Sequence, residues 1–258
     1  HYGFSLAGFG MILGQICFLN GQKKIVDSKR KVMKFNFRSK LPKIDLDRLK
    51  LIVLASGILI IFWASFEQAG GLLNIYAYQK TDRFISYINF EIPASWFQSI
   101  NPLLIILLGF SVSSFWLWFQ KKSKSSSIFK MSIGIIIMGC GFIFMFFASN
   151  EAELYGKSQM YWLVLAYLFH TIGELCASPT ALSFITKLSP KKFVASVMGI
   201  YFAAIGTGNK LAGLIGQYSE KLGEEIIFLG ITSICISVGL MVILFQKKLN
   251  KLSHGADI

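Results

Sequence analysis

The sequence predicts an all-α integral membrane protein with seven transmembrane helices. Of its 258 residues, 54% are hydrophobic and only 15% are charged, whereas soluble domains carry about 25% charged residues. The apolar residues form long runs, and a helix needs roughly 20 such residues to cross the hydrocarbon core. Only helices and closed barrels satisfy their backbone hydrogen bonds in lipid, and these runs are too long for barrel strands, so we expect helices.

Seven segments of the chain qualify as spans, or nearly do, and the first either lacks its beginning or is short. Short polar or charged connections separate them. Their limits are about 1–20, 50–78, 99–119, 129–148, 160–186, 193–218 and 225–245.

The charges of the connections predict the orientation. The chain has 26 Lys and Arg against 13 Asp and Glu, a balance that would suggest nucleic-acid binding in a soluble protein. Twenty-one of the basic residues lie in alternate connections (21–50, 120–130 and 187–192) and in the tail, and only four in the other connections. The positive-inside rule therefore predicts a multi-pass protein of the cell (inner or plasma) membrane, with no nucleic-acid partner and with the 21–50 loop and the C-terminus in the cytoplasm. The 21–50 loop is either simply solvated or also touches anionic headgroups.

Polar residues interrupt the second and third expected spans. Glu67 lies in the outer half of 50–78, one turn after Trp63, which is the deepest tryptophan of the chain. A charge inside the bilayer costs about 2.5–3.5 kcal/mol on insertion scales, so such a residue normally faces a cavity or a partner. Asn101, just before Pro102, is either a helix cap or a polar group that faces a cavity or a partner.

The fifth expected span carries the second intramembrane carboxylate. Glu174 lies near its midplane, and His170 and Ser178 lie four residues to either side on the same helix face. Pro179 is expected to loosen the helix there, as in the discontinuous helices of transporters. Glu174 is either a functional carboxylate or one buried for packing, and His170 makes either an interhelical hydrogen bond or a proton relay. Lys210, in the sixth span, either snorkels to the surface or has a role in the protein.

No motif predicts an enzyme, a metal site or a disulfide. The four cysteines lie in apolar runs without a CxxC pair. The His170 to Glu174 spacing lacks the second histidine of a zinc HExxH motif, and no GxSxG elbow is present. We therefore expect no catalytic residue, no metal and no cofactor. Two buried carboxylates instead favour a carrier that uses protons as the coupling ion.

Four blocks of the sequence resemble the proton-dependent oligopeptide transporter (POT/PTR) family, in the order in which that family has them. They resemble its seventh, eighth, tenth and eleventh helices, so the chain corresponds to the sixth helix through the twelfth. The blocks are FEQAGG (66–71), IPASWFQSINP (92–102), GELCASP (173–179), and MGIYF (198–202) with GNKLAG (208–213).

The resemblance implies a major-facilitator fold, in which two six-helix bundles surround a cavity that opens alternately to either side. Residues 1–20 would be the last helix of the N-terminal bundle and 21–49 a basic cytoplasmic linker. The C-terminal six-helix bundle would be 50–246, and 247–258 a cytoplasmic tail. The rest of the N-terminal bundle is missing from this sequence, so we expect that bundle and the lipid bilayer as partners of the chain.

The resemblance also implies proton-coupled symport of di- and tripeptides and assigns the site residues. Glu174 matches the carboxylate that receives the peptide amino terminus, and Glu67 matches an acidic gate residue tied to protonation. The remaining matched positions would line the substrate pocket: Asn101, Ser178, Trp63, Tyr201 and Phe202.

Two alternatives to peptide symport stay open. Within the family, the substrate is either a peptide or another small solute such as nitrate. Tyr201 stands where the family usually has Trp, which changes the pocket wall and leaves the side-chain preference open. A seven-span sensor or receptor would have the same span count and orientation.

Overall fold

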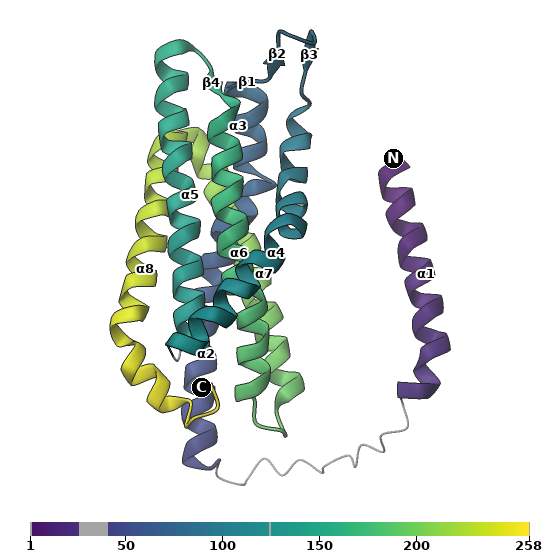
Figure 1. Ribbon diagram of the computed structural model, residues 1–258, viewed down its shortest axis with the longest axis vertical. Helices are drawn as coiled ribbons and strands as arrows, with labels where there is room; N and C mark the ends of the chain where they lie inside the picture. The colour runs from purple at the N-terminus through teal and green to yellow at the C-terminus, as the bar shows by residue number, and fades with distance from the viewer. Residues whose placement is uncertain (1, 26–40, 124, 258) are drawn as a thin grey trace. The chain divides into compact units, whose positions relative to one another are not determined.

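The computed structural model describes residues 2–25, 41–123 and 125–257 (Figure 1). The chain divides into two compact units, His1–Ser39 and Lys40–Ile258. In the first unit the described residues form helix α1 (Tyr2–Ile25). Much of the predicted linker 21–49 lies outside the described residues.

The second unit is built of long helices. Five helical segments in the described ranges are long and apolar enough to cross a membrane: Lys43–Lys80, Ala94–Lys122, Ser127–Tyr155, Met160–Leu188 and Glu224–Leu252. The last three are α5, α6 and α8. The second segment combines the 3₁₀ helix η2 (Ala94–Ser99) with α4 (Ile100–Lys122). Helix α7 (Val194–Leu222) also has 29 residues, but its sequence is more polar.

The first of these five segments is interrupted at Glu67, whereas the sequence predicts one continuous span over 50–78. Helix α2 (Lys43–Phe66) ends there, a 3₁₀ turn (Glu67–Ala69) follows, and α3 (Leu72–Lys80) resumes after Gly70 and Gly71. Two consecutive glycines are poor helix formers, which explains the break at this point. By contrast, α6 continues as one α-helix through Pro179, where the sequence predicts loosening.

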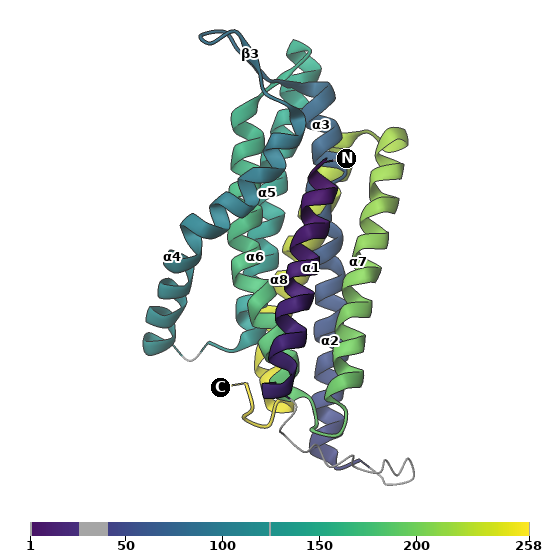
Figure 2. The same cartoon turned by 90° about the vertical axis from the view of Figure 1, so that its right-hand side faces the viewer.

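Helix α5 lies between α6 and α8 and packs closely on both, while α2 packs on α7 (Figures 1 and 2). Small residues allow these approaches, as is usual between membrane helices. A Cβ at Gly134 of α5 would lie 2.7 Å from the carbonyl oxygen of Gly173 in α6, and one at Gly208 of α7 would lie 2.7 Å from the Cβ of Trp63 in α2. Helix α4 packs on α6 and diverges from the bundle toward its C-terminal end (Figure 2).

The largest fully buried side chains form the core between these helices. They include Phe62, Tyr76, Phe142, Tyr167, Phe184 and Phe228.

Short strands tie the connections at one end of the bundle. Strand β1 (Thr81–Asp82) pairs in parallel with β4 (Ser158–Gln159), and β2 (Phe84–Ile85) forms an antiparallel hairpin with β3 (Phe90–Glu91). The buried Tyr76 hydroxyl donates to the Ser158 Oγ at 3.0 Å. These strands fall in connections, so the fold remains a helical bundle.

The C-terminal tail folds back on the other end of the bundle. Helix α8 continues to Leu252, past the predicted end of the last span at 245. His254 Nε2 lies 3.1 Å from Asp47 Oδ2 at the start of α2. The Asp257 carboxylate accepts hydrogen bonds from the Ser127 backbone N–H at 3.0 and 3.2 Å. The tail therefore joins the first turns of α2 and α5.

Candidate functional site

A carboxylate and an amide meet between α4 and α6. The Asn101 Nδ2 donates to Glu174 Oε2 at 2.9 Å and to Thr171 Oγ1 at 3.1 Å. The Thr171 hydroxyl donates in turn to the Tyr167 carbonyl at 2.7 Å, so its oxygen is free to accept from Asn101. Asn101 and Glu174 are both half-buried. One amide group thus uses both of its N–H bonds to fix the carboxylate relative to α4.

Helix packing sets the position of Glu174. Its neighbour Gly173 contacts the α5 backbone at Gly134, and a Cβ at Gly173 would lie 2.7 Å from the Gly134 carbonyl oxygen. This contact presses α6 against α5 on one side, while Asn101 holds it on the α4 side. Asn101 is not the cap of α4, because the N-cap is Ser99 and the Asn101 amide bonds to α6. Of the two alternatives for Asn101, the structure shows the polar contact between helices.

Glu67 lies close enough to Glu174 for the two carboxylates to interact electrostatically. It is half-buried at the break between α2 and α3. Across the described residues, no cationic group lies within salt-bridge distance of either carboxylate. Two unpaired carboxylates at membrane depth form a site that attracts a proton or a cationic group.

Gln68, beside Glu67, holds the broken span against α7. It is 1% exposed, and its Nε2 donates to the carbonyls of Ala64 at 3.0 Å and Ala212 at 3.2 Å. The amide satisfies one carbonyl of the ending α2 and one of α7. The hydrogen bonds of Gln68 therefore fix the backbone beside Glu67, whose gate role remains a prediction.

Trp63 packs where α2 meets α7. Its ring makes edge contacts with Phe62 and Phe66, at centroid distances of 5.7 and 5.5 Å. Its indole Nε1 is buried and has no hydrogen-bond partner among the residues described. A free indole donor one turn before Glu67 is available to an acceptor that reaches this region.

The other predicted pocket residues are not joined to the Asn101–Glu174 pair. Ser178 lies one turn after Glu174 and is half-buried. Tyr201 is 5% exposed and packs in the core, whereas its neighbour Phe202 is 62% exposed, with the two ring centroids 5.3 Å apart. Within the described ranges, no hydrogen bond or ring contact links these three residues to Glu174. Their pocket roles remain predictions.

His170 lies in an apolar notch between α5 and α6. It is 1% exposed, its ring centroid is 4.4 Å from that of Phe142, and a Cβ at Gly141 would collide with it. Neither ring nitrogen has a hydrogen-bond partner in the part of the chain that the structure describes. The interhelical hydrogen bond, one of the two alternatives predicted for His170, is therefore not formed among the described residues. The imidazole instead fills the apolar notch.

Two further features bear on chemistry. Lys210 is exposed on α7, as a lysine that snorkels would be. The described residues contain no group of three or more His, Cys, Asp or Glu side chains that could hold a metal.

Sequence reasoning did not single out Thr171 or assign Gln68 its structural role. A threonine three residues before an intramembrane glutamate lies on the same helix face, which was a usable signal for Thr171. The partner of Gln68 is a backbone carbonyl on another helix, and no sequence pattern indicates it.

The model of the POT family matches residues 23–232 of this chain, which is more than half of it. The chain belongs to the POT family. This match confirms the predicted family and the predicted helical membrane fold. It also confirms that the chain comes from a family of transporters and not of enzymes.

The relatives of this chain include named peptide transporters. The chain is 43% identical to the peptide transporter YePEPT of Yersinia enterocolitica over 162 aligned residues. The alignment covers 61% of this chain and 31% of that protein. It is 30% identical to a di-/tripeptide transporter of Lactococcus lactis over 196 aligned residues. This alignment covers 75% of this chain and 39% of that protein. The chain therefore spans less than two thirds of the length of these relatives.

Solved POT structures have the same fold. A crystal structure of a mutant peptide transporter POT in complex with alafosfalin matches with a TM-score of 0.76 and 26% identity, over 84% of this chain and 44% of that one. A POT family transporter in complex with 5-aminolevulinic acid matches with a TM-score of 0.73 and 25% identity, over 96% of this chain and 54% of that one.

Proposed function

We propose that this chain forms the C-terminal half of a proton-coupled symporter of di- and tripeptides that works by alternating access. The observation that supports this most directly is the Glu174 carboxylate. It lies half-exposed in a membrane helix, Asn101 orients it, and no cation pairs with it among the described residues. The peptide-transporting relatives and the ligand-bound POT structures add support.

In this proposal the peptide amino terminus binds at Glu174. An ammonium group brings the positive charge and the N–H donors that an unpaired carboxylate at low dielectric needs. Asn101 keeps one carboxylate oxygen in place, so the other acceptor positions of Glu174 remain for the peptide. Ser178, Trp63, Tyr201 and Phe202 are proposed to line the rest of the pocket.

Proton coupling is proposed to arise from the proximity of Glu67 and Glu174. Repulsion between the two carboxylates falls when a proton neutralises one or an ammonium group pairs with the other. Glu67 would pair with a basic residue of the N-terminal bundle, and protonation would weaken that pair and release the gate. The membrane potential would add about 2.3 kcal/mol per charge per 100 mV.

We further propose that the protein lies in the plasma membrane with the 21–50 loop and the C-terminal tail in the cytoplasm. The support is the concentration of basic residues in these segments. Protons serve as the coupling ion, and no other cofactor is proposed.

The test is Glu174→Gln in the full-length transporter, reconstituted in proteoliposomes with an inward proton gradient. Glutamine keeps the shape and the contact with Asn101 but cannot pair with an ammonium group. Loss of one charge-assisted interaction is worth about 1.5–3 kcal/mol, so labelled dipeptide uptake should fall roughly 10- to 100-fold.

The matched control is Glu153→Gln, which neutralises an exposed carboxylate at the end of α5 and should leave uptake unchanged. Equal uptake by Glu174→Gln and the control would exclude the assigned role. A competition assay distinguishes the two candidate substrates. Inhibition of labelled dipeptide uptake by excess unlabelled dipeptide supports peptide transport, whereas inhibition by nitrate alone would support the other solute.

A further inference from the structure

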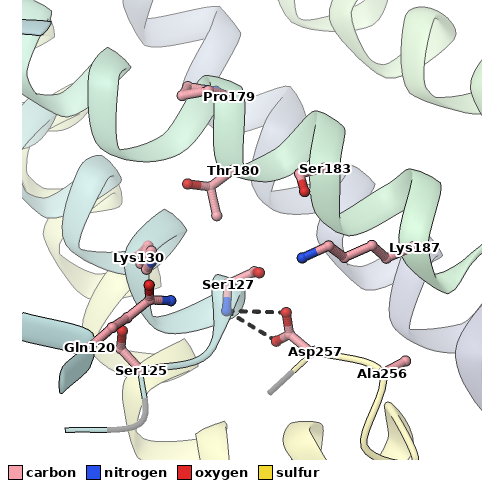
Figure 3. Close-up of a pocket in the computed structure, with 10 residues that line it drawn as sticks. All are labelled: Gln120, Ser125, Ser127, Lys130, Pro179, Thr180, Ser183, Lys187, Ala256 and Asp257. Atoms are coloured by element: carbon pink, nitrogen blue, oxygen red, sulfur yellow. Dashed lines mark hydrogen bonds between the residues drawn. The ribbon is translucent and has the colours of Figure 1, made fainter. Parts of the chain in front are cut away.

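A polar pocket lies at the end of the bundle where the tail docks (Figure 3). Its volume is about 610 Å³. It is bounded by the C-terminal end of α4, the first turn of α5, the second half of α6 and the tail. Its lining residues are Gln120, Ser125, Ser127, Lys130, Pro179, Thr180, Ser183, Lys187, Ala256 and Asp257. Along α6 the lining begins at Pro179, one residue after Ser178 of the proposed peptide site, and extends away from Glu174 to Lys187, one residue before the end of the helix.

The charges in the pocket favour an anion. Lys130 and Lys187 face it, and Asp257 is the one acidic side chain among the described residues that line it. In the described part of the chain neither lysine forms a salt bridge, and the Lys130 Nζ lies 5.4 Å from the Trp116 ring centroid. Figure 3 shows the Lys187 ammonium, the Ser183 hydroxyl and the Asp257 carboxylate directed into one space. The balance is one positive charge in excess.

Asp257 already shows how an anion binds here. Its two carboxylate oxygens accept from the backbone N–H of Ser127, in the first turn of α5, where helix N–H groups have no intrahelical partners. Burial raises the pKa of Asp257, and the Ser127 hydrogen bonds only partly oppose this effect. The carboxylate thus occupies an anion position in the pocket while leaving most of the volume open.

A second, independent observation also points to an absent ligand. Ser125 lines the pocket and is only 8% exposed, yet its Oγ has no hydrogen-bond partner among the described residues. Buried hydroxyls are normally paired, because an unpaired one costs about 1–3 kcal/mol. The hydroxyls of Thr180 and Ser183 add further donors to the same cavity.

We propose that this pocket binds a phosphate group, carried by free phosphate or by the headgroup of an anionic phospholipid, in competition with the Asp257 carboxylate. A phosphate oxygen would replace Asp257 at the Ser127 N–H, and Lys130 and Lys187 would balance the charge. A cavity of this size holds more than one phosphate ion, and basic pockets between helices near the membrane surface suit lipid headgroups.

The proposal predicts opposite effects of two substitutions in the full-length protein. Lys187→Gln removes a positive charge and should weaken the binding of inorganic phosphate about tenfold. Asp257→Asn removes the competing negative charge and should strengthen binding about tenfold. Lys191→Gln is the matched control, because Lys191 is exposed in the connection just after α6 and does not line the pocket. Calorimetric titration of the detergent-solubilised protein with phosphate, against chloride of equal ionic strength, measures all three.

The lipid source is tested with the same variants in vesicles of phosphatidylcholine with or without phosphatidylglycerol, by counting retained lipids in native mass spectra. A headgroup is supported if Asp257→Asn retains more phosphatidylglycerol than wild type and Lys187→Gln retains less. The free ion is supported if only the binding of inorganic phosphate follows this order. A folding defect would weaken both variants, so opposite signs cannot arise from it. Equal binding by Lys187→Gln, Asp257→Asn and Lys191→Gln with both probes would overturn the proposal.

Discussion

Gly134→Ala tests whether the contact between α5 and α6 positions the candidate site. The new Cβ would lie 2.7 Å from the Gly173 carbonyl oxygen, 2.8 Å from the Ala177 Cβ and 3.1 Å from the Ala177 backbone nitrogen. Ordinary contact begins at 3.4 Å. Two of the three blocking atoms belong to the α6 backbone, so no side-chain rotation relieves the clash, and α6 must move away from α5.

The structure allows an estimate of the cost. Overpacking of a well-packed core costs about 1–3 kcal/mol, and we expect about 2 kcal/mol because the obstacle is backbone. For a bundle of this size that corresponds to a decrease in Tm of roughly 4–8 °C. Since Gly173 precedes Glu174, the same movement shifts the carboxylate relative to Asn101, so dipeptide binding should weaken as well.

The assay is thermal unfolding of the purified full-length protein in detergent, followed by tryptophan fluorescence. Gly230→Ala in α8 is the matched control, because a Cβ there meets nothing within 4 Å. Its Tm should be unchanged or slightly higher, since alanine favours a helix by up to about 1 kcal/mol over glycine. If Gly134→Ala unfolded at the same temperature as Gly230→Ala, the close approach of α5 and α6 would be refuted.

Three further predictions concern the broken span and the tail. Gln68→Leu removes the donor to the Ala64 and Ala212 carbonyls, and it should lower the free energy of unfolding by about 1–2 kcal/mol, measured by the same thermal assay. Glu67→Gln cannot release a proton, so uptake driven by a proton gradient should fall while exchange of labelled for unlabelled dipeptide continues; loss of both activities would contradict a role in coupling. Burial raises the pKa of Asp257, so the docked tail binds a proton more readily than the free tail. Docking of the tail should therefore be strongest at low pH and should weaken as the pH rises through the raised pKa. Hydrogen exchange at residues 253–257, relative to Asp257→Asn at each pH, measures this, and a constant ratio would exclude it.

The membrane makes the helical architecture readable from the sequence. Lipid offers no hydrogen-bond partners, so each long apolar run must form a helix, and charges gather in the connections. The boundaries were less accessible: α2 begins at Lys43, within the segment predicted as linker. The break also falls at Glu67 rather than at Pro179. A hydropathy average cannot detect a helix break at a glycine pair, because the glycines change the backbone conformation and leave the mean hydropathy of the segment almost unchanged.

The candidate site was predicted only in part. Glu67 and Glu174 stand out in sequence because ionisable groups are rare at membrane depth. The partner of Glu174 required the structure, since Asn101 reads equally well as a helix cap. His170 is the reverse case: it suggests chemistry in sequence, but Gly141 and Phe142 enclose it in an apolar notch.

The sequence by itself determined the class of protein, its helical spans, the two intramembrane carboxylates and the resemblance to the POT family, because composition and local spacing encode these properties. The tertiary structure decided which groups meet. The Asn101 amide reaches Glu174 over a separation of 73 residues, Gln68 reaches Ala212, and Asp257 reaches Ser127. Such pairs depend on how closely helices approach and in what rotation, and small residues such as Gly134 and Gly173 set that approach only once the whole bundle has packed.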